Sequence, residues 1–75
     1  YYDLGNTYFN MGDFEKAVEN YDRAINLVND VYDYYFNRAL AKFNLEYFND
    51  ACDDLKKASE LGDTEATQYV NELCD

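Results

Sequence analysis

Apolar side chains recur every three or four residues along most of this 75-residue chain, the spacing that places them on one face of an α-helix. The pattern predicts five helices, over residues 1–11, 14–28, 31–45, 48–61 and 65–73. The chain contains no proline, which favours uninterrupted helices because proline breaks the backbone hydrogen-bond ladder. The expected fold class is therefore all-α.

The same spacing predicts which face of each helix is buried. The first helix should bury Leu4, Tyr8 and Met11, and the second should bury Phe14, Ala17, Val18, Tyr21, Ala24, Ile25 and Val28. The last helix is more polar and should turn Ala66, Tyr69, Val70 and Leu73 inward. A polar terminal helix of this kind is typical of a segment that covers the apolar end of a helical stack.

Two glycines mark special positions in this pattern. Gly5 lies inside the first helix, where glycine costs about 1 kcal/mol relative to alanine, so it predicts the close approach of another helix. Gly12 should end that helix because glycine readily takes the left-handed conformation. Asp13 follows it and should cap the second helix.

The pattern also repeats at a fixed interval, since Ala17 and Ala51 are 34 residues apart and so are Ala24 and Ala58. A period of this size indicates a repeat array rather than a single compact enzyme core. The chain resembles the tetratricopeptide repeat family at the following positions of its first helix pair: Tyr1, Leu4, Gly5, Tyr8, Gly12, Ala17, Tyr21 and Ala24. In the second pair the matching residues are Tyr35, Ala39, Ala51, Leu55 and Ala58.

This resemblance implies an α-α superhelix of antiparallel helix pairs. Repeat 1 would span residues 1–30, repeat 2 residues 31–63, and a capping helix residues 64–75. The second repeat departs from the family pattern because Arg38 and Lys42 stand where the first repeat has Leu4 and Tyr8. Because the chain begins without methionine, we interpret it as a fragment of a longer protein.

The resemblance also implies a binding site, because the first helix of each pair lines a concave groove in this family. The residues expected to bind a peptide are Tyr2, Asn6, Phe9, Asn10, Asp33, Phe36, Asn37, Leu40, Phe43 and Asn44. Asparagine both donates and accepts hydrogen bonds and so suits the backbone of an extended peptide, whereas the aromatic residues and leucine suit apolar side chains or a helix face. For Phe9 and Phe43 the alternative is that they only pack against a neighbouring helix.

Some members of this family clamp the acidic C-terminal tails of heat-shock chaperones with two asparagines and several basic residues. Asn6 and Asn37 match the two asparagines, but Tyr2, Thr67 and Asn71 fall at the positions of the basic residues. We therefore expect no such clamp in this chain.

The charge of the chain narrows the class of partner. Sixteen acidic residues against six basic ones give a formal net charge of −10, which argues against nucleic acids and anionic membranes as ligands. A basic or apolar protein segment is the favoured partner. No apolar run approaches the roughly 20 residues of a membrane-spanning helix, and we expect a cytoplasmic location.

No enzymatic activity, cofactor or metal site is expected. The chain has no histidine, so the commonest general base is missing, and its acidic residues do not follow the spacing of a calcium loop. Asp53 and Asp54 are adjacent but are expected to lie on a solvated helix face rather than to form a catalytic pair. Cys52 and Cys74 are expected to be structural thiols in a reducing compartment, with a single disulfide or a redox-active thiol as the alternative.

Two functions are consistent with these observations. The first is a protein–protein interaction module that binds a peptide or helix in its groove. The second is a scaffold segment of a longer repeat array that forms homo-oligomers through its exposed ends.

Overall fold

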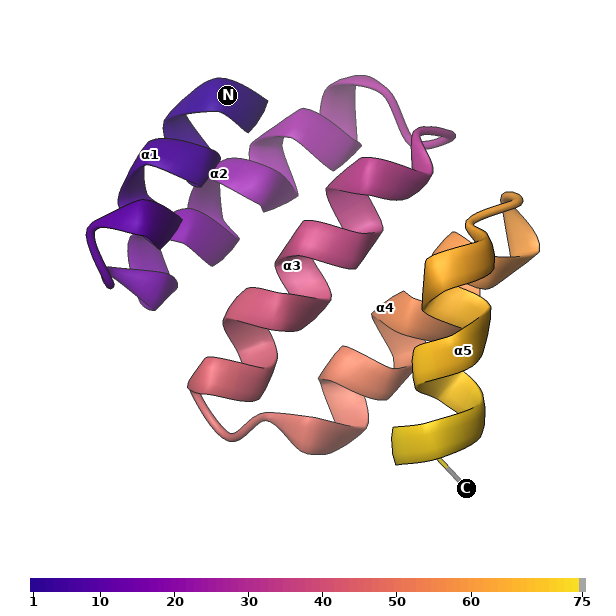
Figure 1. Ribbon diagram of the computed structural model, residues 1–75. Coiled ribbons are helices and arrows are strands. Elements are labelled where there is room, and N and C mark those ends of the chain that lie inside the picture. Colours follow the sequence, from indigo (N-terminus) through magenta and orange to yellow (C-terminus); the bar gives the residue numbers. More distant parts are fainter. Residues whose placement is uncertain (75) are drawn as a thin grey trace.

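The computed structural model describes residues 1–74, and in these residues the chain folds into five helices (Figure 1). They are α1 (Tyr2–Asn10), α2 (Phe14–Leu27), α3 (Tyr32–Asn44), α4 (Phe48–Glu60) and α5 (Thr64–Leu73). Every boundary lies within one residue of its predicted position, and the all-α prediction is confirmed. The predicted capping segment extends to Asp75, which lies outside the described residues.

Each helix packs against the next one along the chain, so that α3 lies between α2 and α4, and α5 packs on α4 (Figure 1). One core cluster, formed by Ala17, Tyr21 and Ala41, lies where α2 meets α3. The larger cluster joins α2, α3, α4 and α5 through Ile25, Tyr35, Ala39, Ala51, Leu55, Ala58 and Ala66. Most of these residues are alanines, which allow the helices to lie close together.

The predicted close approach at Gly5 is confirmed. A Cβ atom added to Gly5 would lie only 2.6 Å from Cε1 of Tyr21, a separation that real Cβ atoms do not tolerate. Tyr21 belongs to α2 and is 1% exposed, so its ring fills the space that the missing side chain of Gly5 leaves open. Glycine at this position is therefore required by packing and not by backbone conformation.

The turns between the helices follow the predicted chemistry. Gly12 has a φ of 81°, in the left-handed region, and the residue 34 positions later, Glu46, has a φ of 65°. The carboxylate of Asp13 accepts a hydrogen bond from the backbone N–H of Lys16 at 3.3 Å, which confirms the predicted cap of α2. Asp63 caps α5 in the same way.

The predicted burial of α1 is wrong for two residues, because Leu4 is 46% and Met11 70% exposed. The repeat period explains why. Arg38 lies 34 residues after Leu4 and points toward α2, where it meets Asp22. On the corresponding side of α1 the described chain has no helix, so Leu4 and Met11 lie at the surface.

Two further residues predicted to be buried, Val28 and Leu73, are 45% and 57% exposed. Val28 follows the last residue of α2, where the backbone has become extended and no longer keeps the helical spacing. Leu73 is the last residue of α5.

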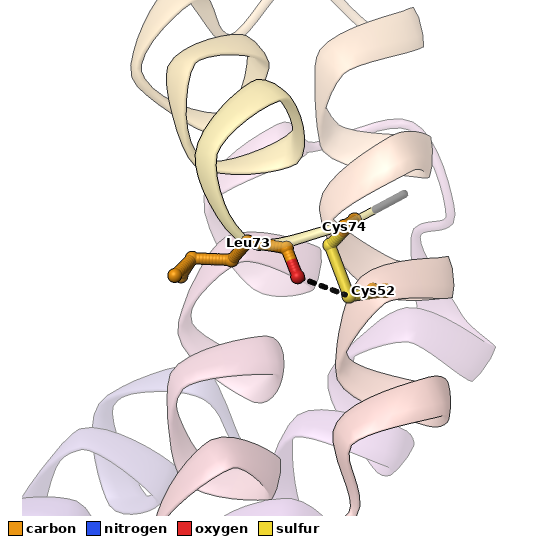
Figure 2. Close-up of a disulfide and its surroundings, with 3 residues drawn as sticks. All are labelled: Cys52, Leu73 and Cys74. Carbon is orange, nitrogen blue, oxygen red and sulfur yellow. Dashed lines mark hydrogen bonds between the residues drawn. A yellow bond between two sulfur atoms is a disulfide. The ribbon is translucent and has the colours of Figure 1, made fainter.

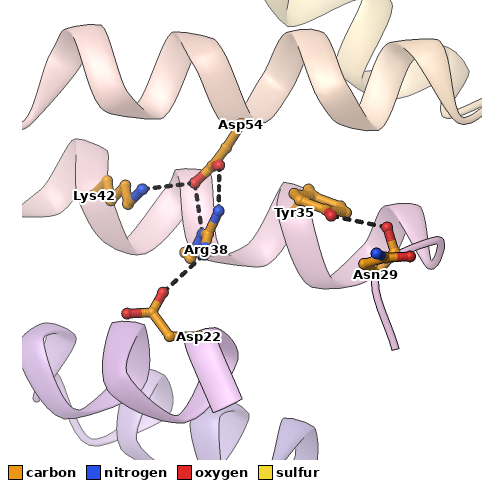
Figure 3. Close-up of polar contacts among 6 residues, drawn as sticks. All are labelled: Asp22, Asn29, Tyr35, Arg38, Lys42 and Asp54. Carbon is orange, nitrogen blue, oxygen red and sulfur yellow. Dashed lines mark hydrogen bonds and ion pairs between the residues drawn. The ribbon is translucent and has the colours of Figure 1, made fainter. Parts of the chain in front are cut away.

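An ion-pair network links α2, α3 and α4, and it overturns the expectation that Asp54 is solvated (Figure 3). The Asp54 side chain is 8% exposed and receives Arg38 Nη2 at 2.7 Å and Lys42 Nζ at 3.0 Å. Arg38 Nη1 also reaches Asp22 of α2 at 2.8 Å. Burial disfavours the charged guanidinium, but the two carboxylates outweigh it and raise the pKa of Arg38.

The expectation of two free thiols is also wrong, because Cys52 and Cys74 form a disulfide with their Cα atoms 5.8 Å apart (Figure 2). Cys52 lies in α4, and the chain returns along α4 through α5, so that Cys74 lies beside Cys52 despite their separation of 22 residues. The cysteines therefore give no support to a reducing compartment. None of the described helices is both long and apolar enough to cross a membrane.

Candidate functional site

The predicted binding residues lie on α1 and α3, and Tyr2 joins the two helices. The ring centroid of Tyr2 is 4.6 Å from that of Tyr34 in α3, and its hydroxyl accepts a hydrogen bond from the amide nitrogen of Asn37. Two of the predicted site residues, 35 positions apart in the sequence, are therefore in direct contact.

Asn6 extends this contact toward α2. The Tyr21 hydroxyl donates a hydrogen bond to Asn6 Oδ1 at 2.5 Å, and the ring centroids of Tyr21 and Tyr2 are 5.8 Å apart. Burial raises the pKa of Tyr2 above its ordinary value, although hydrogen bonds with Asn6 and Asn37 act in the opposite direction. We refer to Tyr2, Asn6, Tyr21 and Asn37 as the Tyr2 cluster.

The aromatic site residues are engaged in packing between helices. Phe9 meets Phe14 edge to face, with ring centroids 5.2 Å apart, and Phe43 meets Phe48 at 6.0 Å. Each contact joins the two helices of one pair and leaves the phenylalanine of the first helix only partly exposed. Phe9 and Phe43 therefore make the packing contacts of the alternative considered above, and a role in binding stays a prediction for both.

Phe36 makes a different contact, because its ring lies 5.6 Å from that of Tyr69 in α5. Leu40 is half-buried one turn further along α3, and its carbonyl oxygen accepts a hydrogen bond from the Asn44 amide at 2.9 Å. The remaining predicted residues, Asn10 and Asp33, are exposed.

Basic side chains are missing from the helices that carry the predicted site. On α1, α3 and α5 the only basic residues are Arg38 and Lys42, and both are held by Asp54. The hydroxyl of Thr67, which stands at one of the expected basic positions, donates to the backbone of Asp63 at 3.1 Å. Both basic side chains of these three helices are therefore already paired with a carboxylate of the chain.

Sequence reasoning missed a cavity of about 320 Å³ beside the Tyr2 cluster. It is lined by Tyr1, Tyr2, Asp3, Ala24, Leu27, Val28 and Tyr34. Leu27 and Val28 are apolar and exposed, at 72% and 45%, where α2 ends. The sequence signal for this cavity was the adjacent apolar pair Leu27 and Val28 at the end of the second predicted helix.

Residues 5–46 match the family described as TPR repeat, and residues 32–61 match the tetratricopeptide repeat. The chain belongs to the tetratricopeptide repeat family. The matches cover both helix pairs, in agreement with the 34-residue period.

Several curated proteins are similar to this tetratricopeptide repeat chain. It is 39% identical over 57 residues to Hsp70-Hsp90 organizing protein 2 of Arabidopsis thaliana, and 44% identical over 57 residues to sperm-associated antigen 1 of Homo sapiens. It is 36% identical over 67 residues to stress-induced-phosphoprotein 1 of Caenorhabditis elegans. These matches cover 76%, 76% and 89% of the chain but only 10%, 6% and 21% of the three relatives.

Tetratricopeptide repeat domains are protein–protein interaction modules and generally have no enzymatic activity. Membership of this family therefore supports the predicted class of function, a protein–protein interaction module. The residues that contact a ligand remain a prediction.

Tyr21 should make stability depend on alkaline pH. Burial, with a smaller contribution from Tyr2, raises the pKa of Tyr21 to about 12 from an ordinary value near 10. The unfolded chain therefore loses this proton first, and the stabilisation present below pH 10 is lost as the pH rises toward 12. Between pH 10 and pH 12, the free energy of unfolding of the wild type, measured with urea, should fall by about 2 kcal/mol more than that of the Tyr21→Phe variant. If the free energy of unfolding of the two proteins fell by the same amount over this range, the raised pKa of Tyr21 would be contradicted.

Proposed function

We propose that this chain binds an extended protein segment along the face that α1 and α3 share, with the Tyr2 cluster at its centre. The observation that supports the proposal most directly is the contact between Tyr2 and Asn37, which joins the two helices. Residues 1–30 and 31–63 then act as the two repeats, and each contributes its first helix to the binding face.

The asparagines of the cluster are oriented for a peptide backbone. Asn6 uses its carbonyl oxygen to accept from Tyr21 and its amide group to hydrogen-bond Tyr2, which leaves one amide N–H to donate to a ligand carbonyl. Asn37 uses its amide nitrogen to donate to Tyr2, which leaves its carbonyl oxygen to accept from a ligand N–H. One donor and one acceptor held in this way match the alternating groups of an extended chain.

Apolar groups beside the cluster favour a segment with a hydrophobic side chain. The lining of the cavity of about 320 Å³ includes Ala24, Leu27 and Val28 at the end of α2 and two tyrosines, Tyr1 and Tyr34. Leu40, half-buried on α3, offers a second apolar contact. Such anchors contribute most of the binding free energy of many peptide complexes.

Charge favours a basic or uncharged segment over an acidic one. The chain carries a formal charge of −10, and the exposed Asp33 lies among the predicted binding residues. One relative is named Hsp70-Hsp90 organizing protein 2. We do not carry that partnership over to this chain, because Tyr2, Thr67 and Asn71 occupy the positions where a clamp for acidic tails needs basic residues.

The binding face can be tested with peptides selected from a random phage-displayed library against the folded chain. Asn6→Ala, Asn37→Ala and Leu40→Ala should each weaken the selected peptides at least about tenfold, because each removes a hydrogen bond or an apolar contact in a partly desolvated site. Calorimetric titration measures the affinity, and circular dichroism confirms that each variant is folded.

Asn49→Ala and Glu60→Ala, on exposed positions of α4, are matched controls and should keep the wild-type affinity. Full affinity in all three variants of the binding face would rule this face out. An affinity that requires a free acidic C-terminus in the peptide would show that the ligand class is wrong.

A second candidate function is supported by the exposed apolar side of α1. Leu4 is 46% and Met11 70% exposed, and Leu4 stands 34 residues before Arg38, which in the second repeat contacts α2 of the first. This surface fits a scaffold segment that associates with another copy of itself.

Sedimentation equilibrium across a wide concentration range tests this second function. Self-association should be present in the wild type and absent from the Leu4→Glu/Met11→Glu double variant, because burying a carboxylate in an apolar interface is strongly unfavourable. Tyr47→Glu, at a residue that is 51% exposed between α3 and α4, should associate like the wild type. A wild-type protein that remains monomeric at every concentration would exclude the scaffold function.

A further inference from the structure

The disulfide holds the end of α5 against the middle of α4 (Figure 2). Cys52 lies within α4, whereas Cys74 directly follows the last residue of α5, Leu73. The Cys52 sulfur also lies 3.9 Å from the carbonyl oxygen of Leu73. The covalent link is therefore placed at the C-terminal end of α5.

The beginning of α5 has its own non-covalent anchors. The Asp63 carboxylate accepts hydrogen bonds from the backbone N–H groups of Glu65 and Ala66, at 3.0 and 3.2 Å. Ala66 is fully buried, and the hydroxyl groups of Ser59 and Thr67 are 2.5 Å apart. This half of the helix can remain on α4 without the disulfide.

The end of α5 lacks comparable anchors. Asn71, Glu72 and Leu73 are exposed, and the last turn contains no basic residue to interact with the partial negative charge of the helix terminus. Glu72 adds a negative charge at that terminus, which is unfavourable. A helix of ten residues has little intrinsic stability in water. The last turn of α5 therefore depends on the packing of Tyr69 and Val70 against the core cluster and on the disulfide.

The part of α5 that the disulfide secures covers an element of the proposed binding face. Tyr69 packs its ring 5.6 Å from that of Phe36, which lies on α3. Val70 and Cys74 pack on the same core cluster. Movement of this turn away from the helix bundle would uncover Phe36.

The disulfide also borders a cavity at the surface. Both sulfurs belong to residues that are partly exposed, and a cavity of about 420 Å³ is lined by Phe48, Asn49, Cys52, Asp53, Lys56, Leu73 and Cys74. A small dithiol has room to approach the sulfur–sulfur bond through this cavity.

We propose that Cys52–Cys74 is a redox latch that keeps the end of α5 closed over Phe36. In the opening step a dithiol reductant attacks one sulfur as its thiolate and forms a mixed disulfide. Its second thiolate then displaces the protein sulfur. Two electrons and two protons pass to the protein, the Cys52 and Cys74 thiols form, and the reductant becomes a cyclic disulfide.

Loss of the covalent link releases the last turn of α5, while the Asp63 cap and Ala66 keep its first turn in place. The latch acts on α5 and on its contact with Phe36 of α3, and it does not depend on which ligand the α1–α3 face binds.

Hydrogen exchange of the full chain, read by NMR at single amides, tests the latch. Treatment with dithiothreitol should speed exchange of the amides of residues 70–73 at least about tenfold, because local opening no longer has to strain a covalent loop. Amides of α1 and α2 should change by less than about twofold in the same sample. The Cys52→Ser/Cys74→Ser variant should exchange like the reduced wild type and should not respond to dithiothreitol.

Two results would overturn the latch. Unchanged exchange at residues 70–73 after complete reduction would show that non-covalent contacts alone hold the turn. Equal acceleration in all five helices would show that the disulfide stabilises the whole fold rather than one turn. Peptide affinity is measured in a separate titration, so the latch and the proposed binding face can fail independently.

Discussion

The contact between the backbone of Gly5 and the ring of Tyr21 connects the fold of this chain to its candidate site. Because Gly5 has no side chain, α1 comes close enough for the Tyr21 ring to lie directly beneath it. In that position the Tyr21 hydroxyl reaches Asn6, and its ring supports Tyr2, which in turn holds Asn37 on the next repeat. A larger residue at position 5 would displace the ring and with it the polar groups of the binding face.

The stacking of the two repeats depends on a second set of contacts, which α3 makes on both of its sides. Ala41 packs against Ala17 and Tyr21 of the first pair, while Arg38 joins Asp22 of α2 to Asp54 of α4. A buried ion pair of this kind contributes little net stability relative to apolar packing, but removing one partner leaves a costly unpaired charge. The network therefore favours one alignment of the helix pairs, the alignment that brings α1 and α3 together.

Helical spacing in the sequence was sufficient to predict all five helices, and Gly5 and Asp13 were sufficient to predict a close contact and a cap. The errors arose where burial depends on another part of the chain. The sequence of α4 alone predicts a solvated Asp54, because the residues that neutralise its charge, Arg38 and Lys42, lie on α3. Leu4 has the spacing of a buried residue, but no helix of the described chain covers it. The binding residues predicted from the family resemblance lie on α1 and α3, and their role in binding stays a prediction. The pairing of Tyr2 with Asn37 results from the way the repeats stack.

The free energy of unfolding of Gly5→Ala, measured by urea denaturation, tests this account most directly. At an ordinary helix position this substitution stabilises a protein by about 1 kcal/mol. Here the added methyl group would lie 2.6 Å from Tyr21, so the account predicts a loss of about 1–3 kcal/mol. Thr7→Ala, on the exposed side of the same helix, is the control and should not destabilise the fold by a comparable amount. A Gly5→Ala protein more stable than the wild type would contradict the close packing of α1 on α2, and with it the proposed origin of the binding face.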